Sequence, residues 1–584
     1  MEIHYSSEKA PQILIALFKE FGIKKIIASP GKTNVTFVAS VQQDPYFQVY
    51  SAVDERSAAY MACGLAAESG EPIVISCTGA TASRNYMPGL TEAYYRKLPV
   101  IALTSNTGTH NRHNLIAQQI DRSISPIDIA KIKISIPFIK DKEDEQNAAF
   151  LINKALLELS RNGGGPIHID YSTRYSEDYS VKTIPEVRKI SRISVIDKFP
   201  SLDNKKIIIF IGSHKNFTKE ETELIERFCH QYGAVVYCDH TSGYYGKYRV
   251  QYALMGLQPY KEDTNISDIL IHLGEISGDY YSLGQNPKEV WRISADGELR
   301  DTFHKLKYVF EMPEIFFFRS YLNSDSKKQE QNLQYQNCLR IEKETREKIP
   351  ELPFSNIWIA QQMCDNLPIG SELHLGILNT LRSWNFFNVP QGVETFCNVG
   401  GFGIDGCVSS TLGASLYNSE KLYFCVVGDL AFMYDLNSIC NRHVGANLRI
   451  MLINNGLGAE FTNYGHSASK MGDLTRTFIA AEGHFGKKSK KLVRDFATDL
   501  GFEYLSASTK EEFFKNKDHF LSSTKYDKPI IFEIFTDSKN ESEAIKIMSH
   551  LVEKPLTPTQ FIKNIVKDTV GEERIVKARK LLNI

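Results

Sequence analysis

Two polar turns in the second half of the sequence have the residue types of a metal site. Gly428-Asp429-Leu430 follows the apolar run 423–427, and Asn454-Asn455-Gly456 follows the apolar run 450–453. If these runs are neighbouring parallel strands, both turns emerge at the carboxyl edge of one sheet, where α/β folds bind ligands. An Asp carboxylate and an Asn amide oxygen are hard ligands that suit Mg²⁺ or Ca²⁺ holding a diphosphate. Each turn taken alone could equally be an ordinary loop.

A pair of acidic residues at the start of a predicted helix is the second candidate. Asp54 and Glu55 open an Ala-rich stretch that ends near Gly70. Carboxylates are stabilised at a helix N-terminus by the helix dipole. Helix capping alone therefore explains both residues as well as a catalytic role does. A catalytic role is favoured because the same sequence also contains the predicted metal-binding turns.

The order of the elements predicts an α/β protein. Apolar runs of strand length alternate with helix-length stretches, which is typical of parallel sheets. Strands are expected at 26–28, 73–77, 100–104, 207–211, 234–237, 268–273, 373–376, 423–427, 450–453 and 529–534. We expect three doubly wound parallel-sheet domains at 1–180, 190–325 and 350–540, followed by a C-terminal helical arm at 541–584.

Composition excludes several classes of protein. The chain has 584 residues, and its 68 Lys and Arg against 69 Asp and Glu give a net charge of −1. That balance offers no general basic field for nucleic acid. No apolar run reaches the roughly 18 residues of a transmembrane helix, and the N-terminus lacks a secretory signal. The ten cysteines form no CxxC pair. We therefore expect buried thiols in a reducing cytoplasm rather than a zinc site.

Taken together, these motifs resemble the thiamine-diphosphate-dependent enzymes. The most similar branch is the MenD type, the 2-succinyl-5-enolpyruvyl-6-hydroxy-3-cyclohexene-1-carboxylate synthases. The resemblance covers the first and third predicted domains and is weak in the middle one. Leu430 stands where the family motif usually has Gly, a change that several branches allow. The stretches that carry the resemblance are Ser29-Pro30-Gly31, Asp54–Ala59, Cys77-Thr78, Asn85-Tyr86, Glu92–Tyr95, 403–406, Gly428-Asp429-Leu430 and 434–437.

The resemblance implies thiamine diphosphate held by Mg²⁺, or by Ca²⁺ in its place. Asp429, Asn455 and the backbone carbonyl of Leu457 would ligate the metal. Glu55, from a partner subunit, would contact the aminopyrimidine ring and promote loss of the C2 proton, while the cofactor supplies the difficult chemistry. Phe402 or Ile404 would supply an apolar wedge that bends the cofactor, although core packing explains either side chain as well. The other expected cofactor contacts are Gly376, Asn379, Gly428 and Leu430.

Polar residues near the expected pocket are candidates for contacts with substrate. Gln118 matches an active-site Gln of the wider family. His110 and His113 lie in the loop after the predicted strand 100–104, where related decarboxylases place proton-shuttling histidines. The alternative is that both are exposed loop residues. Further substrate candidates are Lys32, which could equally be a surface lysine, Asn34 and His443.

The sequence departs from the branch at arginines that bind acidic substrates there. Lys32-Thr33 follows Gly31 where the branch has Ser-Arg. Val399 stands in place of a second Arg, and a third aligns near Leu416. An Arg fork binds a carboxylate with two parallel hydrogen bonds, whereas Val and Leu offer none. We therefore expect a substrate pair that is less acidic, or held differently, than isochorismate and 2-oxoglutarate.

The expected activity is that of a thiamine-diphosphate- and Mg²⁺-dependent carboligase. It would decarboxylate a 2-oxo acid such as pyruvate and transfer the acyl-anion equivalent to a carbonyl or activated acceptor. The alternatives are a non-oxidative 2-oxo-acid decarboxylase, a MenD-type synthase and a cofactor-binding scaffold without activity. Since the family shares each site between two chains, we expect a homodimer or homotetramer, with no nucleic-acid or membrane partner. No Gly-x-Gly-x-x-Gly follows 207–211, so no FAD is expected.

Overall fold

The computed structural model of the chain describes residues 2–108, 110, 112, 114–322, 331–484 and 489–552. The chain forms two compact units. The first comprises residues 1–199 and 296–311, and the second comprises residues 200–295 and 312–584. Of the sequence-based predictions, His113 and the part of the C-terminal arm beyond residue 552 lie outside the described residues.

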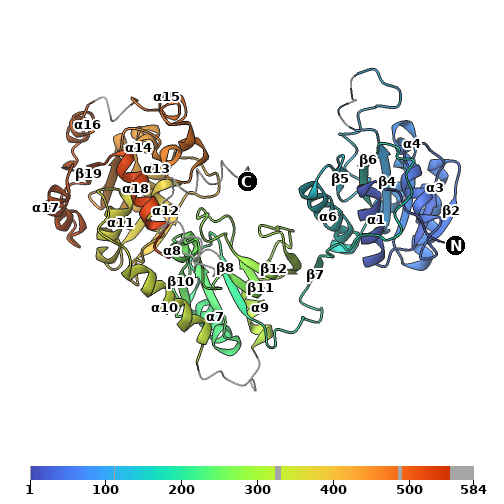
Figure 1. Ribbon diagram of the computed structural model, residues 1–584, viewed down its shortest axis with the longest axis horizontal. Coiled ribbons are helices and arrows are strands. Elements are labelled where there is room, and N and C mark those ends of the chain that lie inside the picture. The colour runs from blue at the N-terminus through green and yellow to red at the C-terminus, as the bar shows by residue number, and fades with distance from the viewer. Residues whose placement is uncertain are drawn as a thin grey trace, which may run out of the picture. The chain divides into compact units, whose positions relative to one another are not determined.

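The first unit contains a six-stranded parallel sheet in the order β2-β1-β3-β4-β6-β5 (Figure 1). Strands β4 and β6 are buried along their whole length, as expected for a parallel sheet with both faces covered. Another parallel pair of this unit joins β7 and β13. The strands are β1 (Lys25–Ala28), β2 (Gln48–Ser51), β3 (Ile73–Thr78), β4 (Val100–Asn106), β5 (Lys133–Ile136), β6 (Ile167–Ser172), β7 (Ser191–Ile193) and β13 (Leu306–Glu311).

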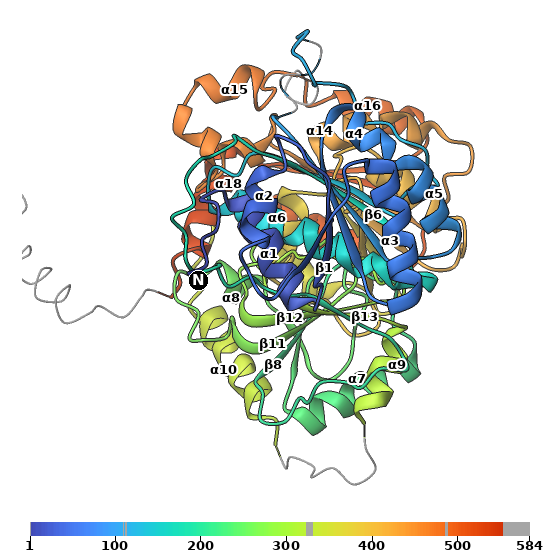
Figure 2. The same cartoon turned by 90° about the vertical axis from the view of Figure 1, so that its right-hand side faces the viewer.

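Helices cover both faces of the first sheet, and each face has its own apolar cluster. Leu14, Phe18 and Phe37 belong to one cluster, and Ala59 and Tyr86 belong to the other. Figure 2 shows α1, α2 and α6 on one side of the strands and α3, α4 and α5 on the other. The helices are α1 (Lys9–Glu20), α2 (Val35–Val41), α3 (Glu55–Ser69), α4 (Ala80–Asn85), α5 (Met87–Tyr95), α6 (Lys142–Leu156), η2 (Leu157–Leu159) and η3 (Arg161–Gly163).

A parallel sheet in the second unit has the strand order β10-β9-β8-β11-β12. Helix α7 is well delimited, because Thr218 and Glu221 form a capping box at its start and Gly233 ends it in the left-handed conformation. The elements are β8 (Ile207–Ile211), α7 (Lys219–Tyr232), β9 (Val235–Cys238), β10 (Arg249–Gln251), α8 (Ala253–Leu257), β11 (Ile266–Leu273), β12 (Asn286–Ser294), α9 (Glu314–Tyr321) and α10 (Leu333–Glu347).

The other sheet of the second unit is parallel, in the order β15-β14-β16-β17-β19-β18. Its strands are β14 (Glu372–Leu375), β15 (Glu394–Cys397), β16 (Tyr423–Gly428), β17 (Leu448–Asn454), β18 (Glu503–Ala507) and β19 (Ile530–Phe535). Its helices are α11 (Asn356–Met363), η4 (Cys364–Asn366), α12 (Asn379–Trp384), α13 (Cys407–Ser415), α14 (Asp429–Tyr434), η5 (Leu436–Cys440), η6 (Ala459–Thr462), η7 (Ser467–Met471), α15 (Leu474–Phe478), α16 (Leu492–Asp499), α17 (Lys510–Leu521) and α18 (Ser538–Met548).

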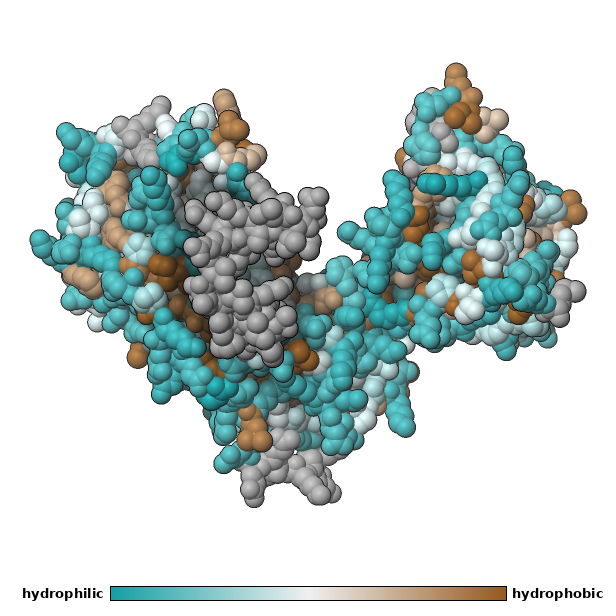
Figure 3. Space-filling view, viewed as in Figure 1, coloured by the Kyte–Doolittle hydropathy of each residue, from teal (hydrophilic) through white to brown (hydrophobic). Residues whose placement is uncertain are grey.

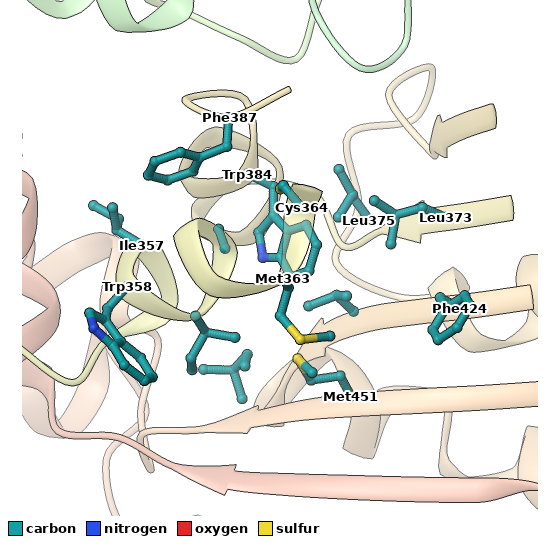
Figure 4. Packing of buried hydrophobic residues seen from close by; sticks show 14 of the residues in the cluster. Ile357, Trp358, Met363, Cys364, Leu373, Leu375, Trp384, Phe387, Phe424 and Met451 are labelled. Carbon is teal, nitrogen blue, oxygen red and sulfur yellow. The ribbon is translucent and has the colours of Figure 1, made fainter. Parts of the chain in front are cut away.

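Helix α12 is held firmly by the core of the second unit. Figure 4 shows the indole of Trp384 packed beside Met363 and close to Leu375 in one buried apolar cluster. The indole Nε1 donates to the amide oxygen of Asn356 (3.1 Å), and the imidazole of His240 lies 3.0 Å from the Trp384 carbonyl oxygen. Fixing the end of α12 in this way also fixes its first turn, which faces the predicted cofactor site.

The predicted α/β fold class is confirmed by the parallel sheets with helices packed against them. The ten predicted strands are present with shifts of a residue or two at their ends. Residues 423–427 and 450–453 belong to β16 and β17, which pair in parallel with Gly428 opposite Ile453. The two polar turns therefore leave the same edge of one sheet. Among the described residues, no helix is long and apolar enough to cross a membrane.

Candidate functional site

Asp429 is the one carboxylate among the predicted metal ligands, and it is buried. It is the first residue of α14, and its side chain is only 4% exposed. Its Oδ1 accepts the N–H of Leu430 (2.8 Å) and its Oδ2 accepts the N–H of Gly456 (2.6 Å). Burial raises the pKa of Asp429 to about 6. No cationic side chain of the described residues pairs with Asp429. Its buried negative charge therefore has no compensating positive charge among these residues.

Asn455 and Leu457 bring two further oxygens to the same edge. Both residues are buried, and the Asn455 amide oxygen accepts the N–H of Leu457 (3.4 Å). The carboxylate of Asp429, the Asn455 amide oxygen and the Leu457 carbonyl are all hard donors of the kind that Mg²⁺ prefers. The described residues hold no cluster of three or more His, Cys, Asp or Glu that could bind a metal. A buried carboxylate that lacks a counter-ion beside neutral oxygens fits a divalent cation.

The turn after β14 has a backbone shaped for close contact. The N–H of Gly376 donates to the Val426 carbonyl (2.8 Å), and a Cβ at Gly376 would lie 3.3 Å from that oxygen. Leu378 has a φ of +67°, a conformation that costs a non-glycine residue about 1–3 kcal/mol and clusters at functional sites. Asn379 begins α12, and its amide oxygen accepts from the Asn463 side chain (2.9 Å). Because β14 and β16 are neighbours, this turn shares the edge that bears Asp429.

Phe402 and Ile404 lie in the loop before α13. Both side chains are half-buried and pack against the apolar core of the second unit. The ring of Phe402 stacks on that of Tyr280 with centroids 6.1 Å apart, and its backbone φ is +57°. Part of each side chain thus contacts the core, while part remains accessible for a ligand.

Glu55 is the first residue of α3 but does not cap that helix. The cap is Asp54, whose Oδ1 accepts the N–H of Arg56 (3.2 Å) and whose Oδ2 accepts the hydroxyl of Ser57 (2.8 Å). Glu55 is half-buried, and its Oε2 accepts from the side-chain amide of Asn85 (3.1 Å). Asp54 therefore caps the helix, whereas the carboxylate of Glu55 contacts the side chain of Asn85. This decides which of the two residues is the cap, a question that the sequence left open.

The loop between β4 and β5 carries Gln118 and His110. Both are exposed, and Gln118 has a φ of +67°. The imidazole of His110 lies 6.0 Å from the ring of Phe138. Figure 3 shows this loop as a brown tip on the first unit. Its exposed apolar side chains are Leu115, Ile116, Ile124 and Ile127.

The three weaker substrate candidates occupy different surroundings. Lys32 is exposed, with its ammonium 5.0 Å from the ring centre of Tyr175. Asn34 is buried, and its amide donates to the Ser29 carbonyl (3.0 Å), so it holds the turn after β1. His443 is exposed in the second unit, and its N–H donates to the side chain of the neighbouring Asn441 (2.9 Å).

A cavity of about 480 Å³ in the second unit borders the turn after β14. Leu378 and Asn379 line it, together with Arg382, Glu460 and Tyr280. Arg382 is 8% exposed; it pairs with Glu460, and its guanidinium lies 4.1 Å from the ring centre of Tyr280. The charge of this arginine is therefore already compensated. This ion pair could not be predicted from the sequence, because Arg382 and Glu460 are far apart in the chain and neither belongs to a recognisable motif.

The chain is similar to known proteins along nearly its whole length. Residues 8–125 match the family described as "Thiamine pyrophosphate enzyme, N-terminal TPP binding domain". The chain is similar to proteins named 2-succinyl-5-enolpyruvyl-6-hydroxy-3-cyclohexene-1-carboxylate synthase from several bacteria. The relative from Phocaeicola vulgatus is 30% identical, over 94% of this chain and 99% of its own length. That from Bacteroides fragilis is 29% identical over the same shares, and that from Flavobacterium psychrophilum is 26% identical over 90% and 96%.

Proposed function

Because the chain belongs to the 2-succinyl-5-enolpyruvyl-6-hydroxy-3-cyclohexene-1-carboxylate synthase family of thiamine-diphosphate-dependent enzymes, we propose that it is a Mg²⁺-dependent carboligase. It decarboxylates a 2-oxo acid, pyruvate being the simplest donor, and joins the remaining acyl unit to a carbonyl or activated acceptor. When bound, thiamine diphosphate supplies the nucleophilic carbon and the electron sink that this chemistry needs.

The observation that carries this proposal is the environment of Asp429. A carboxylate buried at a strand end, pinned by two backbone N–H groups and lacking a cationic partner among the described residues, supports a site for a bound divalent cation. Asp429, Asn455 and the Leu457 carbonyl would hold Mg²⁺. The backbone turn at Gly376 and the amide of Asn379 would hold the diphosphate, since they reach the same sheet edge.

Glu55 would serve the opposite end of the cofactor. Its carboxylate does not cap the helix, so Oε1, the oxygen that Asn85 does not contact, can hold or release a proton beside the aminopyrimidine ring. Gln118 and His110, on the exposed loop of the same unit, would orient the substrate and transfer protons to it. We infer at least a homodimer, in which Glu55 of one chain completes the metal-binding half of the other.

The cavity beside Leu378 supports a substrate with few negative charges. Its buried Arg382 is compensated by Glu460, which leaves no net positive charge from this pair for a second carboxylate. That agrees with the non-arginine residues at Thr33, Val399 and Leu416. The second candidate function is the synthase reaction for which the relatives are named. Similarity over nearly the whole of both chains favours it.

The test begins with full-length protein stripped of metal and cofactor. It is titrated with thiamine diphosphate and Mg²⁺, and CO₂ release is then measured from pyruvate and from 2-oxoglutarate, with and without acceptors. Glu55→Gln is compared with Glu68→Gln, a matched change on the exposed side of the same helix.

Each outcome of this test has a distinct meaning. Saturable binding with pyruvate turnover that is lost only in Glu55→Gln supports the carboligase. Release of free aldehyde in the presence of every acceptor supports a simple decarboxylase instead. Turnover of 2-oxoglutarate with isochorismate supports the reaction of the relatives. Absence of cofactor binding contradicts all three.

A further inference from the structure

Glu55 receives a side-chain hydrogen bond from a short neighbouring helix. The donor is the amide Nδ2 of Asn85, 3.1 Å from Oε2 of Glu55, and Asn85 is the last residue of α4. A carboxylate has two oxygens, and this contact occupies one of them. It therefore sets the rotation of the carboxylate and leaves Oε1 as the oxygen that is free for the cofactor ring.

Helix α4 is fixed at its beginning by a close approach that needs glycine. Gly79 is the residue before the helix. A Cβ at this position would lie 2.8 Å from the carbonyl oxygen of Ser105 and 3.2 Å from Nη2 of Arg122. The start of α4 therefore lies directly against the end of β4 and against a guanidinium group. Side-chain volume at position 79 would push the helix away from both.

The guanidinium of Arg122 is itself locked into the sheet. Arg122 is 9% exposed, with Nη2 donating to Oδ1 of Asp170 (2.9 Å) and Nη1 to the hydroxyl of Thr104 (3.0 Å). Asp170 is also buried and accepts from Thr104 (2.7 Å) and Asn106 (2.8 Å). Charge-assisted hydrogen bonds of this kind are strong and directional. Thr104 and Asp170 belong to β4 and β6, which are internal strands of the sheet. These hydrogen bonds therefore hold the guanidinium of Arg122 in a fixed position relative to those strands.

A second link joins α4 to the chain beside Arg122. Arg84, next to the last residue of α4, donates from Nη2 to the carbonyl of Asp121 (3.3 Å). The same segment carries Gln118 four residues before Arg122. One buried anchor therefore restrains both the helix that contacts Glu55 and the loop that bears the predicted active-site Gln118.

Cys77 and Tyr86, the other titratable groups close to Glu55, carry no charge that could pair with its carboxylate. Burial raises the pKa of the Cys77 thiol to about 12, with a smaller contribution from the Glu55 charge. Burial also raises the pKa of the Tyr86 hydroxyl well above its ordinary value. Both groups are neutral near pH 7. Asn85 is thus the neighbour that orients the carboxylate through a hydrogen bond.

We propose that α4 is the positioning element for Glu55, with Asn85 and Arg122 as positioning residues at its two ends. Asn85 fixes Oε2 of Glu55, and Arg122 fixes the helix that carries Asn85. This inference rests on the proposed function, because it assumes that Glu55 acts on the bound cofactor.

A double-mutant cycle on the full-length protein tests the Asn85 end. Asn85→Ala is made in the wild type and in Glu55→Gln. The readouts are the Kd of thiamine diphosphate at saturating Mg²⁺, by calorimetry, and the exchange rate of its C2 proton. In the wild type we expect exchange to slow by about tenfold and Kd to weaken by about threefold. In the Glu55→Gln background we expect changes of less than about twofold. Thr81→Ala, an exposed change on α4, is the matched control.

The Arg122 end is tested by two further variants. Arg122→Lys keeps the charge but loses the planar fork, so C2-proton exchange should slow and cofactor binding should weaken, as they do for Asn85→Ala. If that variant does not fold, Gly79→Ala displaces the start of α4 without removing a charge, and it should give the same pattern.

The proposal is overturned if Asn85→Ala matches the wild type, or if it lowers exchange equally in both backgrounds, as a merely structural role would. It is also overturned if a folded Gly79→Ala protein keeps wild-type exchange. A wild type that does not bind thiamine diphosphate contradicts the proposed function instead, and the calorimetry reveals this before any variant is made.

Discussion

Asp429 and Glu55 are both acidic residues at the first position of a helix, yet they are held in different ways. Asp429 is buried and pinned by backbone N–H groups from two turns of one sheet edge. Glu55 is half-buried and receives its hydrogen bond from the side chain of Asn85. The metal half of the predicted site is thus built by strand geometry. The proton-transfer half depends on side chains, so single substitutions should affect the two halves differently.

The largest effect is expected at the side-chain half. Glu55→Gln should slow exchange of the cofactor C2 proton by about 10³-fold, because a positioned general acid–base group contributes about 10²–10⁴-fold. The Kd of the cofactor should stay within about tenfold, since the metal half is untouched. Exchange is measured by quenched-flow NMR in D₂O. Equal exchange in Glu55→Gln and in the Glu68→Gln control would remove Glu55 from the mechanism.

The next effect is expected at the backbone-built half. Asp429→Asn removes the one charged oxygen of the metal set, so thiamine diphosphate with Mg²⁺ should bind about 10²-fold more weakly. The stripped protein should meanwhile be as stable as wild type or more so at pH 8, because a buried carboxylate without a counter-ion is gone. Calorimetry and thermal unfolding measure the two quantities. Tight binding by Asp429→Asn would place the metal elsewhere.

A third prediction concerns pH and a buried acid behind the metal half. Glu541 accepts the N–H of Asn356 (3.1 Å) and the hydroxyl of Thr536 (2.7 Å), and burial raises its pKa from 4.5 to about 7. The folded state therefore favours the protonated acid. This stabilisation is complete below pH 4.5 and is lost as the pH rises through 7. Its loss should lower the free energy of unfolding by about 3 kcal/mol.

Comparison of Glu541→Gln with wild type separates the contribution of Glu541 to the pH dependence of stability from that of Asp429. The variant should lose less stability than wild type between pH 4.5 and pH 8 and be the more stable protein at pH 8. Urea unfolding of both stripped proteins across this range measures the difference. Parallel pH profiles for the two proteins would show that Glu541 is charged in the fold.

The smallest effect is expected in the cavity beside Leu378. Glu460→Gln would release the charge of Arg382, which is buried and stacked on Tyr280. A donor with a second carboxylate should then be favoured, so kcat/KM for 2-oxoglutarate relative to pyruvate should rise about fivefold. An unchanged ratio would exclude this cavity as the donor pocket. Glu511→Gln, which removes the same charge from an exposed position on the separate helix α17, serves as the control.

The sequence was sufficient to predict the class of fold because the central strands are continuous apolar runs. Two edge strands were not predicted, because they contain no such apolar run. β2 (Gln48–Ser51) and β18 (Glu503–Ala507) are largely exposed or half-buried and carry polar residues, so they lack that signal. Burial on both faces produces the pattern in most central strands, and an edge strand does not need it. The buried internal strand β6 was also not predicted, because His168 and Asp170 interrupt its apolar residues.

The candidate site shows the same division. Asp429 and Asn455 could be predicted because each directly follows a recognisable strand, and parallel topology brings strand ends together. Asn85 and the Arg382–Glu460 pair could not, because their contacts join segments that only the folded chain brings together. The sequence also could not assign capping between Asp54 and Glu55, since either carboxylate suits a helix start.

The capping of α3 by Asp54 also determines how a mutation at Glu55 would affect a cell. Since Glu55 has no part in closing the first turn of α3, a lesion at that codon should leave a well-folded protein that cellular quality control does not remove. If the site is shared between two chains, as proposed, such a subunit would still assemble with intact ones. A cell carrying both alleles would then make mixed dimers in which half of the sites are silent, so activity would fall only in proportion to the share of altered chains.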